Sequence, residues 1–268
     1  MAYAFAAITG ATSGIGAAFA RALPPQTNLL LSGRDAAKLA AAKAALAQGG
    51  RRVETVAADL ASEAGRRYFL AAATALPIEL LVNNAGLGRF GRVIDNPAES
   101  EREMVEVNVV AVVTLTRALL PQMLERAAAR GSRAGLIIVG STASFQPTPY
   151  LATYGATKTF DLFYAEALAG ELSQLPIDVL ALCPGGTETA FFTRRHARLA
   201  ARVCCTRAGR ARGTCSPRTQ ERACGGRLEP PRRHARPTLA ARDRGAHGGT
   251  ADAPALRGVR RRTQKVGT

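Results

Sequence analysis

Residues 9–16 read Thr9-Gly10-Ala11-Thr12-Ser13-Gly14-Ile15-Gly16, and this glycine-rich stretch decides how the rest of the chain is interpreted. It follows an apolar run, residues 3–9, that predicts a strand, and it opens a segment, residues 14–23, that predicts a helix. Glycines let the backbone approach a pyrophosphate closely, and the helix that follows presents free N–H groups to it. The order of strand, glycine-rich loop and helix therefore predicts a dinucleotide-binding site, and a structural turn with incidental glycines is the alternative.

Short apolar runs and helical segments alternate outward from this loop. Asn96 is the predicted cap of the long helix that starts at Pro97. Strands separated by helices indicate βαβ units, and right-handed crossovers then give a doubly wound, Rossmann-like α/β fold with a parallel sheet. Ligands bind such sheets at the carboxyl ends of the strands. The predicted strands lie at residues 3–9, 28–32, 52–57, 78–83, 136–139 and 177–182, and the predicted helices at 14–23, 35–48, 62–76, 97–126 and 151–172.

Three further motifs accompany the glycine-rich loop. Asn83-Asn84-Ala85-Gly86 closes the fourth strand, Tyr154-Gly155-Ala156-Thr157-Lys158 lies in the last helix, and Pro184-Gly185-Gly186-Thr187-Glu188-Thr189 follows the sixth strand. With the T-G-x-x-x-G-I-G loop, these motifs resemble the short-chain dehydrogenase/reductase superfamily up to about residue 192. The resemblance implies an oxidoreductase that interconverts an alcohol and a ketone or aldehyde by hydride transfer.

Four residues form the predicted catalytic set: Asn108, Ser141, Tyr154 and Lys158. Tyr154 and Lys158, four residues apart, share one helix face. A free phenol, with a pKa of about 10, is a poor proton donor and acceptor at neutral pH, and a nearby ammonium group stabilises its anion. The Ser141 hydroxyl can stabilise a developing oxyanion. The resemblance implies that Asn108 kinks the long helix and binds a water molecule that relays protons from Lys158. Tyr154 and Lys158 could instead be an ordinary pair on one helix face, and Ser141 could instead be a helix N-cap.

Arg34 favours NADP as the cofactor over NAD. NAD-binding folds often place an acid at the end of the second strand, where this chain has Gly33, and the guanidinium of the next residue suits a 2′-phosphate. An arginine in a solvated loop is the alternative. The resemblance assigns Asp59 to the adenine amino group; a loop or capping role is its alternative. The predicted cofactor contacts are Gly10, Thr12, Ser13, Gly14, Ile15, Gly16, Arg34, Asp59, Asn83, Ala85, Gly86, Tyr154, Lys158, Pro184, Gly185, Thr187 and Thr189.

A hydrophobic substrate pocket is a weaker prediction, because plain packing explains the same residues equally well. Its predicted wall consists of Ala143, Phe145, Pro147, Tyr150, Phe191 and Phe192.

The charge distribution divides the chain. Residues 1–193 contain 16 basic and 16 acidic residues, whereas residues 194–268 contain 20 basic and 4 acidic ones. The second segment has no aromatic residue and no isoleucine, so it cannot bury enough apolar surface to offset its ordering entropy. We therefore expect a catalytic domain at 1–193 and a disordered, arginine-rich tail at 194–268. The seventh, edge strand that the family would add is missing from the sequence, and the tail's G/C-rich codons suggest a frame shift near residues 196–203.

Partner classes follow from composition. Arginine runs bind nucleic acid non-specifically, and no aromatic residue lies among them to stack bases, so no specific nucleic acid is expected. The chain has no CxxC pair, so no metal site is expected. No apolar run reaches the roughly 18–20 residues of a membrane span. We expect a cytoplasmic enzyme with a small-molecule substrate, and the resemblance adds a homodimer through helices 97–126 and 151–172. The alternatives are a dinucleotide-binding protein that does not turn over and an arginine-rich nucleic-acid binder.

Overall fold

The computed structural model describes residues 3–185. Within them, six parallel strands form one sheet in the order β3-β2-β1-β4-β5-β6, which confirms the predicted Rossmann-like α/β fold. The predicted tail, its frame shift and the missing seventh strand lie outside the described residues. The strands are β1 (Phe5–Ile8), β2 (Asn28–Gly33), β3 (Val53–Ala57), β4 (Leu80–Asn83), β5 (Ala134–Val139) and β6 (Ile177–Leu182). The helices are α1 (Gly14–Ala22), α2 (Ala36–Leu46), α3 (Glu63–Thr74), α4 (Ala98–Val105), α5 (Ala111–Ala129) and α6 (Ala152–Glu171), with short turns η1 (Gln48–Gly50), η2 (Glu106–Val110) and η3 (Thr142–Phe145).

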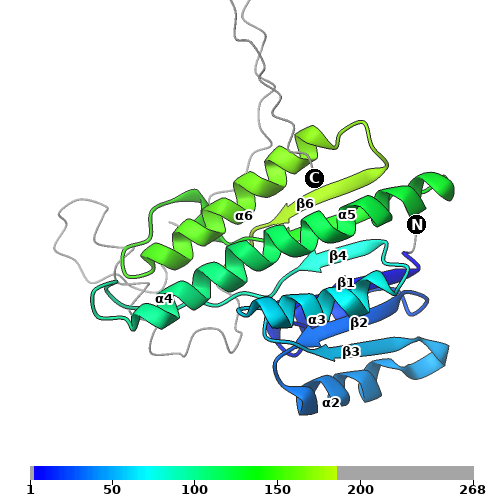
Figure 1. The fold of residues 1–268 in the computed structure, drawn as a ribbon, viewed down its shortest axis with the longest axis horizontal. Coiled ribbons are helices and arrows are strands. Elements are labelled where there is room, and N and C mark those ends of the chain that lie inside the picture. Colours follow the sequence, from blue (N-terminus) through cyan, green and yellow to red (C-terminus); the bar gives the residue numbers. More distant parts are fainter. Residues whose placement is uncertain (1–2, 186–268) are drawn as a thin grey trace, which may run out of the picture. The chain divides into compact units, whose positions relative to one another are not determined.

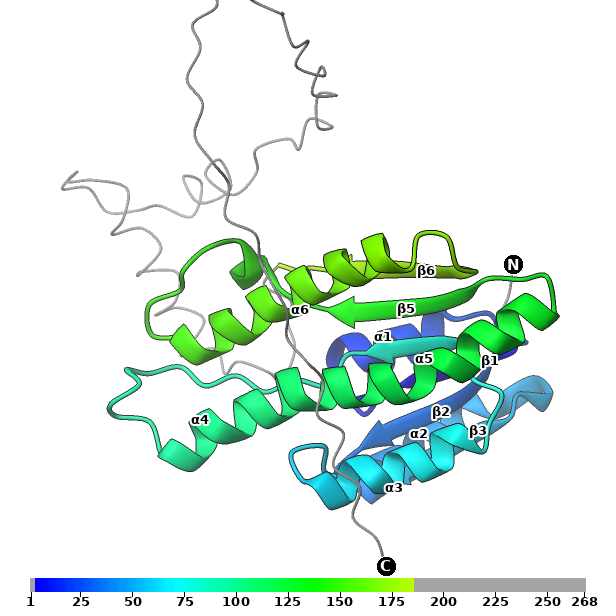
Figure 2. The ribbon, with the colours of Figure 1, turned by 45° about the horizontal axis from the view of Figure 1, so that its top comes forward.

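Helices cover both faces of the sheet. Figures 1 and 2 show α3, α5 and α6 on one face and α1 and α2 on the other. Phe69, Leu115 and Leu168 belong to the core on the first face, and Ala20 and Leu39 to the core on the second. Burial on both faces explains why the strands are nearly continuous apolar runs rather than alternating ones.

The long helix predicted at residues 97–126 is interrupted. It passes from α4 through the π-helical turn η2 into α5, and Asn108 lies in that turn. The prediction that Asn96 caps this helix is wrong. Pro97 occupies the capping position without a side-chain cap bond, and the Asn96 amide donates to Glu101 Oε1 at 2.6 Å instead. Asn96 lies one residue too far out to reach the first helical N–H groups.

One helical stretch among the described residues, Ala98–Ala129, has the length and apolar composition of a membrane span. Half of its most apolar window is buried inside the protein, and Leu115, Leu119 and Met123 are fully enclosed in the core against the sheet. Its apolar character is thus explained by its place as a core helix.

The sheet's switch point lies between β1 and β4, where the chain order reverses. The two carboxyl ends are joined by Thr9, whose buried Oγ1 accepts hydrogen bonds from Asn84 N at 3.0 Å and Ala85 N at 2.9 Å. The glycine-rich loop and the Asn83–Gly86 motif are therefore held against one another at the end of the sheet.

Replacing Thr9→Val should destabilise the fold by about 1–3 kcal/mol, because valine keeps the shape but leaves two N–H groups without their acceptor. Urea unfolding measures this change. Thr55→Val is the matched control, since the Thr55 hydroxyl in β3 has no hydrogen-bond partner among residues 3–185. Equal stability changes in the two variants would contradict the expectation.

Candidate active site

The glycine-rich loop is shaped by close contact with the end of β4. Gly10 has a left-handed φ of 63°, and a Cβ added there would lie 2.9 Å from the Ala85 Cα. A Cβ on Gly16 would lie 2.4 Å from both Asn84 Nδ2 and Gly10 O. Asn84 Nδ2 donates to Thr9 O at 2.8 Å and to Gly10 O at 3.1 Å. Only a chain without side chains at these glycines can approach β4 this closely.

Arg34 lies at the neighbouring strand end, beside Gly33. A Cβ on Gly33 would lie 2.7 Å from Thr12 Cγ2, so the end of β2 also packs against the glycine-rich loop. The exposed Arg34 guanidinium pairs with Glu103 Oε1 of α4 at 3.2 Å. Asp59 follows β3, and its Oδ1 accepts from Ala61 N at 3.1 Å while the side chain stays exposed.

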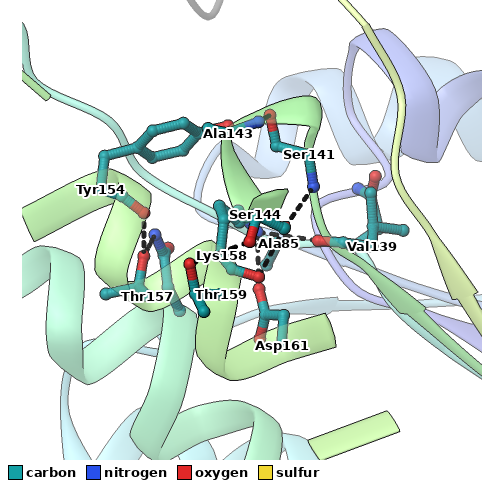
Figure 3. Close-up of polar contacts among 12 residues, drawn as sticks. Ala85, Val139, Ser141, Ala143, Ser144, Tyr154, Thr157, Lys158, Thr159 and Asp161 are labelled. Atoms are coloured by element: carbon teal, nitrogen blue, oxygen red, sulfur yellow. Dashed lines mark hydrogen bonds and ion pairs between the residues drawn. The ribbon is translucent and has the colours of Figure 1, made fainter. Parts of the chain in front are cut away.

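Ser141, Tyr154 and Lys158 come from two segments that follow β5. Ser141 caps η3, where its Oγ accepts from Ala143 N at 3.2 Å. Tyr154 and Lys158 lie on the buried face of α6. Figure 3 shows the Tyr154 ring directed toward Ser141 and Ala143. The structure thus shows the capping role that was the alternative for Ser141, and its catalytic role stays a prediction.

Asn108 is completely buried and its amide is fully engaged. Its Oδ1 accepts from Leu87 N at 2.8 Å, and its Nδ2 donates to Leu87 O at 2.9 Å and to Thr157 Oγ1 at 2.9 Å. Thr157 Oγ1 in turn donates to Tyr154 O at 2.8 Å. Asn108 thus ties the loop after β4 to the helix that carries Tyr154.

Lys158 is held by two acceptors. Its Nζ donates to Val139 O at 2.8 Å and to Asp161 Oδ2 at 2.9 Å (Figure 3). Burial raises the pKa of Asp161 to about 6, even though the Lys158 ammonium acts to lower it. The sequence analysis did not predict a role for Asp161. Its place three residues after Lys158, on a helix face that is otherwise largely apolar, could have indicated a buried ion pair.

The site residues from both halves of the sheet surround one cavity of about 580 Å³. Three predicted residues, Gly16, Asn83 and Asn108, are buried and do not line the cavity. Asn83 Nδ2 donates to Thr116 Oγ1 at 2.8 Å. Thr187 and Thr189 lie outside the described residues. Asn84, which belongs to the Asn83–Gly86 motif but was not among the predicted cofactor contacts, also lines the cavity. The predicted residues that line it are Gly10, Thr12, Ser13, Gly14, Ile15, Arg34, Asp59, Ala85, Gly86, Ser141, Tyr154, Lys158, Pro184 and Gly185.

The predicted hydrophobic wall is only partly present at the cavity. Ala143 lines it, together with Gln146, Thr148 and Leu151, whereas Phe145 and Pro147 do not. Tyr150, at a left-handed φ of 66°, stacks on Phe90 with ring centroids 5.7 Å apart. Phe191 and Phe192 lie outside the described residues.

Metal chemistry has no candidate ligand set here. Residues 3–185 contain no group of three or more His, Cys, Asp or Glu side chains that could hold a metal ion. Cofactor chemistry does fit: the glycine-rich loop offers a cradle that a Cβ would fill, and an arginine lies at the rim. The glycine-rich loop and the arginine therefore suit a phosphate-bearing dinucleotide.

A family model described as short chain dehydrogenase matches residues 4–199. The chain belongs to the short-chain dehydrogenase family. This match spans the whole described sheet and all the motifs that line the cavity.

Named relatives of this short-chain dehydrogenase differ in length and cofactor. The very-long-chain 3-oxoacyl-CoA reductase of Kluyveromyces lactis is 36% identical over 182 residues, which cover 66% of this chain and 53% of that protein. The chain thus spans about half the length of this relative. A short-chain dehydrogenase from Sphingobium yanoikuyae in complex with NADPH is 33% identical, with a TM-score of 0.62 and coverage of 70% and 72%. A Burkholderia phymatum family member in complex with NAD is 26% identical, with a TM-score of 0.65 and coverage of 78% and 81%.

Asp161 should give this dehydrogenase a pH-dependent stability term. Its pKa rises from 3.8 to about 6 on folding, so the folded state holds the proton more tightly. The stability of the wild type relative to Asp161→Asn should be greatest below about pH 4 and fall as the pH rises through 6. Chemical denaturation of both proteins at a series of pH values measures the difference. A difference that stays constant from pH 4 to pH 7 would overturn this expectation.

Proposed function

We propose that this short-chain dehydrogenase is an NADP-dependent oxidoreductase that interconverts an alcohol and a ketone or aldehyde, with Tyr154 as the acid–base residue. One observation carries the proposal. The Tyr154, Lys158 and Ser141 side chains line the same cavity as the glycine-rich loop and Arg34. A proton-transfer group and a phosphate-binding loop at one cavity suit hydride chemistry on a carbonyl carbon.

The chain's own residues would hold the dinucleotide along the carboxyl edge of the sheet. The backbone at Gly10, Gly14 and Ile15 lines the cavity and would hold a pyrophosphate, with N–H groups supplied by the start of α1. Arg34 offers its guanidinium to a 2′-phosphate. Structural relatives with NADPH and with NAD both exist, so the arginine is the feature of this chain that favours NADP. When bound, the nicotinamide supplies or accepts the hydride.

In this proposal, residues that follow β5 transfer the proton to and from the substrate oxygen. Tyr154 gives a proton to the substrate oxygen during reduction and takes it back during oxidation. The Lys158 ammonium lies one helical turn away on the same face of α6 and lines the same cavity. The Ser141 hydroxyl donates to the same substrate oxygen and stabilises negative charge on it. Asn108 keeps α6 in place through Thr157, and its predicted link to a relay water belongs to this proposal.

A homodimer through α5 and α6 also remains a proposal. Val113 on α5 and Phe163 on α6 are exposed large apolar side chains, and Phe163 is 63% exposed. Such side chains suit an interface between two copies, where apolar residues are enriched at the buried centre.

Tyr154→Phe should lower kcat by about 10²- to 10⁴-fold, because the hydroxyl that transfers the proton is removed. NADPH binding, followed by fluorescence titration, should weaken far less than turnover, although Tyr154 is also a predicted cofactor contact. Steady-state NADPH oxidation with a panel of ketones and aldehydes measures the rate. Tyr164→Phe is the matched control, since it makes the same change farther along α6, away from the cavity. Unchanged turnover in Tyr154→Phe would refute the assigned role.

Arg34→Gln should weaken NADPH binding by about tenfold or more and leave NADH binding nearly unchanged, because a charge-assisted bond to the 2′-phosphate is lost. Glu103→Gln should tighten NADPH binding, since Arg34 then loses its competing carboxylate. Titrations with both nucleotides at fixed ionic strength measure these changes. Arg117→Gln, an exposed arginine of α5 away from the cavity, is the control. Equal weakening of NADPH and NADH by Arg34→Gln would exclude phosphate recognition.

A further inference from the structure

The unexplained side chain nearest the cavity is Asp161. It is a charged residue at 1% exposure on α6, and its Oδ1 has no hydrogen-bond partner within residues 3–185. A buried carboxylate is costly unless something compensates it. Its compensation here is a single ion pair, from Asp161 Oδ2 to Lys158 Nζ at 2.9 Å.

The ion pair lies on the side of Lys158 that faces away from the cavity. Lys158 and Val139 line the cavity, whereas Asp161 does not. A Cβ added to Gly86 would lie 3.4 Å from Lys158 Nζ, so the ammonium reaches across to the loop after β4. Two of its three N–H groups go to Val139 O and Asp161 Oδ2, and residues 3–185 offer no acceptor for the third.

A lysine side chain is flexible, with a compact charge on a four-carbon stem. Two anchors from different elements, one from β5 and one from α6, restrict that flexibility. The carbonyl of Val139 alone would leave the buried ammonium without a counter-charge. The Asp161 carboxylate supplies that counter-charge and fixes the direction of the Nζ group.

We propose that Asp161 is a positioning residue, which holds the Lys158 ammonium in place beside Tyr154. This inference rests on the proposed function for its catalytic consequence. The energetic coupling of Asp161 to Lys158 can be measured without any enzymatic activity.

The first experiment measures that coupling without cofactor or substrate. Urea unfolding compares the wild type with Asp161→Leu, Lys158→Met and the double variant. Each single change leaves one buried charge unpaired, and the double change leaves none. We expect the denaturation midpoint of the double variant to lie closer to the wild type than either single variant. Losses that simply add would overturn the proposal.

The second experiment separates positioning from general stability. Asp161→Leu should lower kcat by up to about 10²-fold, the effect of a misplaced catalytic group, with little change in the KM for the carbonyl substrate. Asp161→Asn keeps an oxygen acceptor but not the counter-charge, and it should recover only part of that loss. The double variant with Lys158→Met should be no slower than Lys158→Met alone, because Asp161 acts through Lys158. Rates are expressed per NADPH-binding site, so that unfolded protein is not counted.

Leu162→Ala is the matched control, a buried apolar residue next to Asp161 on α6 that is not part of the cavity lining. It should lower stability and leave the rate per binding site near that of the wild type. If Asp161→Leu behaves like Leu162→Ala, or if its loss multiplies with that of Lys158→Met, Asp161 has only a structural role. Absence of turnover in the wild type would defeat the proposed function, while the unfolding experiment would still decide whether Asp161 holds Lys158.

Discussion

The close contact between the ends of β1 and β4 is the constraint on which the site depends. Thr9 accepts hydrogen bonds from the Asn84 and Ala85 backbone, and the Asn84 amide donates back to Thr9 O and Gly10 O. This reciprocal pairing joins two motifs that lie more than 70 residues apart in the chain. It brings the glycine-rich loop to the switch point of the sheet, where an open crevice forms because neighbouring helices lie on opposite faces.

A second network, around α6, organises the other half of the cavity. Asn108 bonds to both backbone groups of Leu87 and to Thr157, and Ser144 Oγ donates to Lys158 O at 2.6 Å. Lys158 is then anchored at its far end by Val139 and Asp161. The helix that carries Tyr154 is thereby joined to β5, to η3 and to the loop after β4. Buried polar networks of this kind rigidify a site when their members are satisfied.

Family membership and the proposed reaction rest on different observations. The family follows from the model that matches residues 4–199. The reaction is proposed from the side chains around the cavity, because one fold supports many chemistries and the relatives with bound cofactor hold either NADPH or NAD. Arg34, which carries the proposed preference for NADP, pairs with Glu103 in the structure.

The sequence by itself determined the parallel α/β fold and the order of its elements, because strands buried on both faces leave continuous apolar runs and glycine-rich turns mark the strand ends. It also supplied Tyr154, Lys158 and Ser141 as candidates, since their spacing is local. Only the tertiary structure showed that Gly16, Asn83 and Asn108 do not line the cavity. It also showed two ion pairs, Arg34 with Glu103 and the buried Asp161 with Lys158. These contacts depend on how the helices and loops pack against the sheet. The local sequence does not reveal them, because the residues that contact one another are often far apart in the chain.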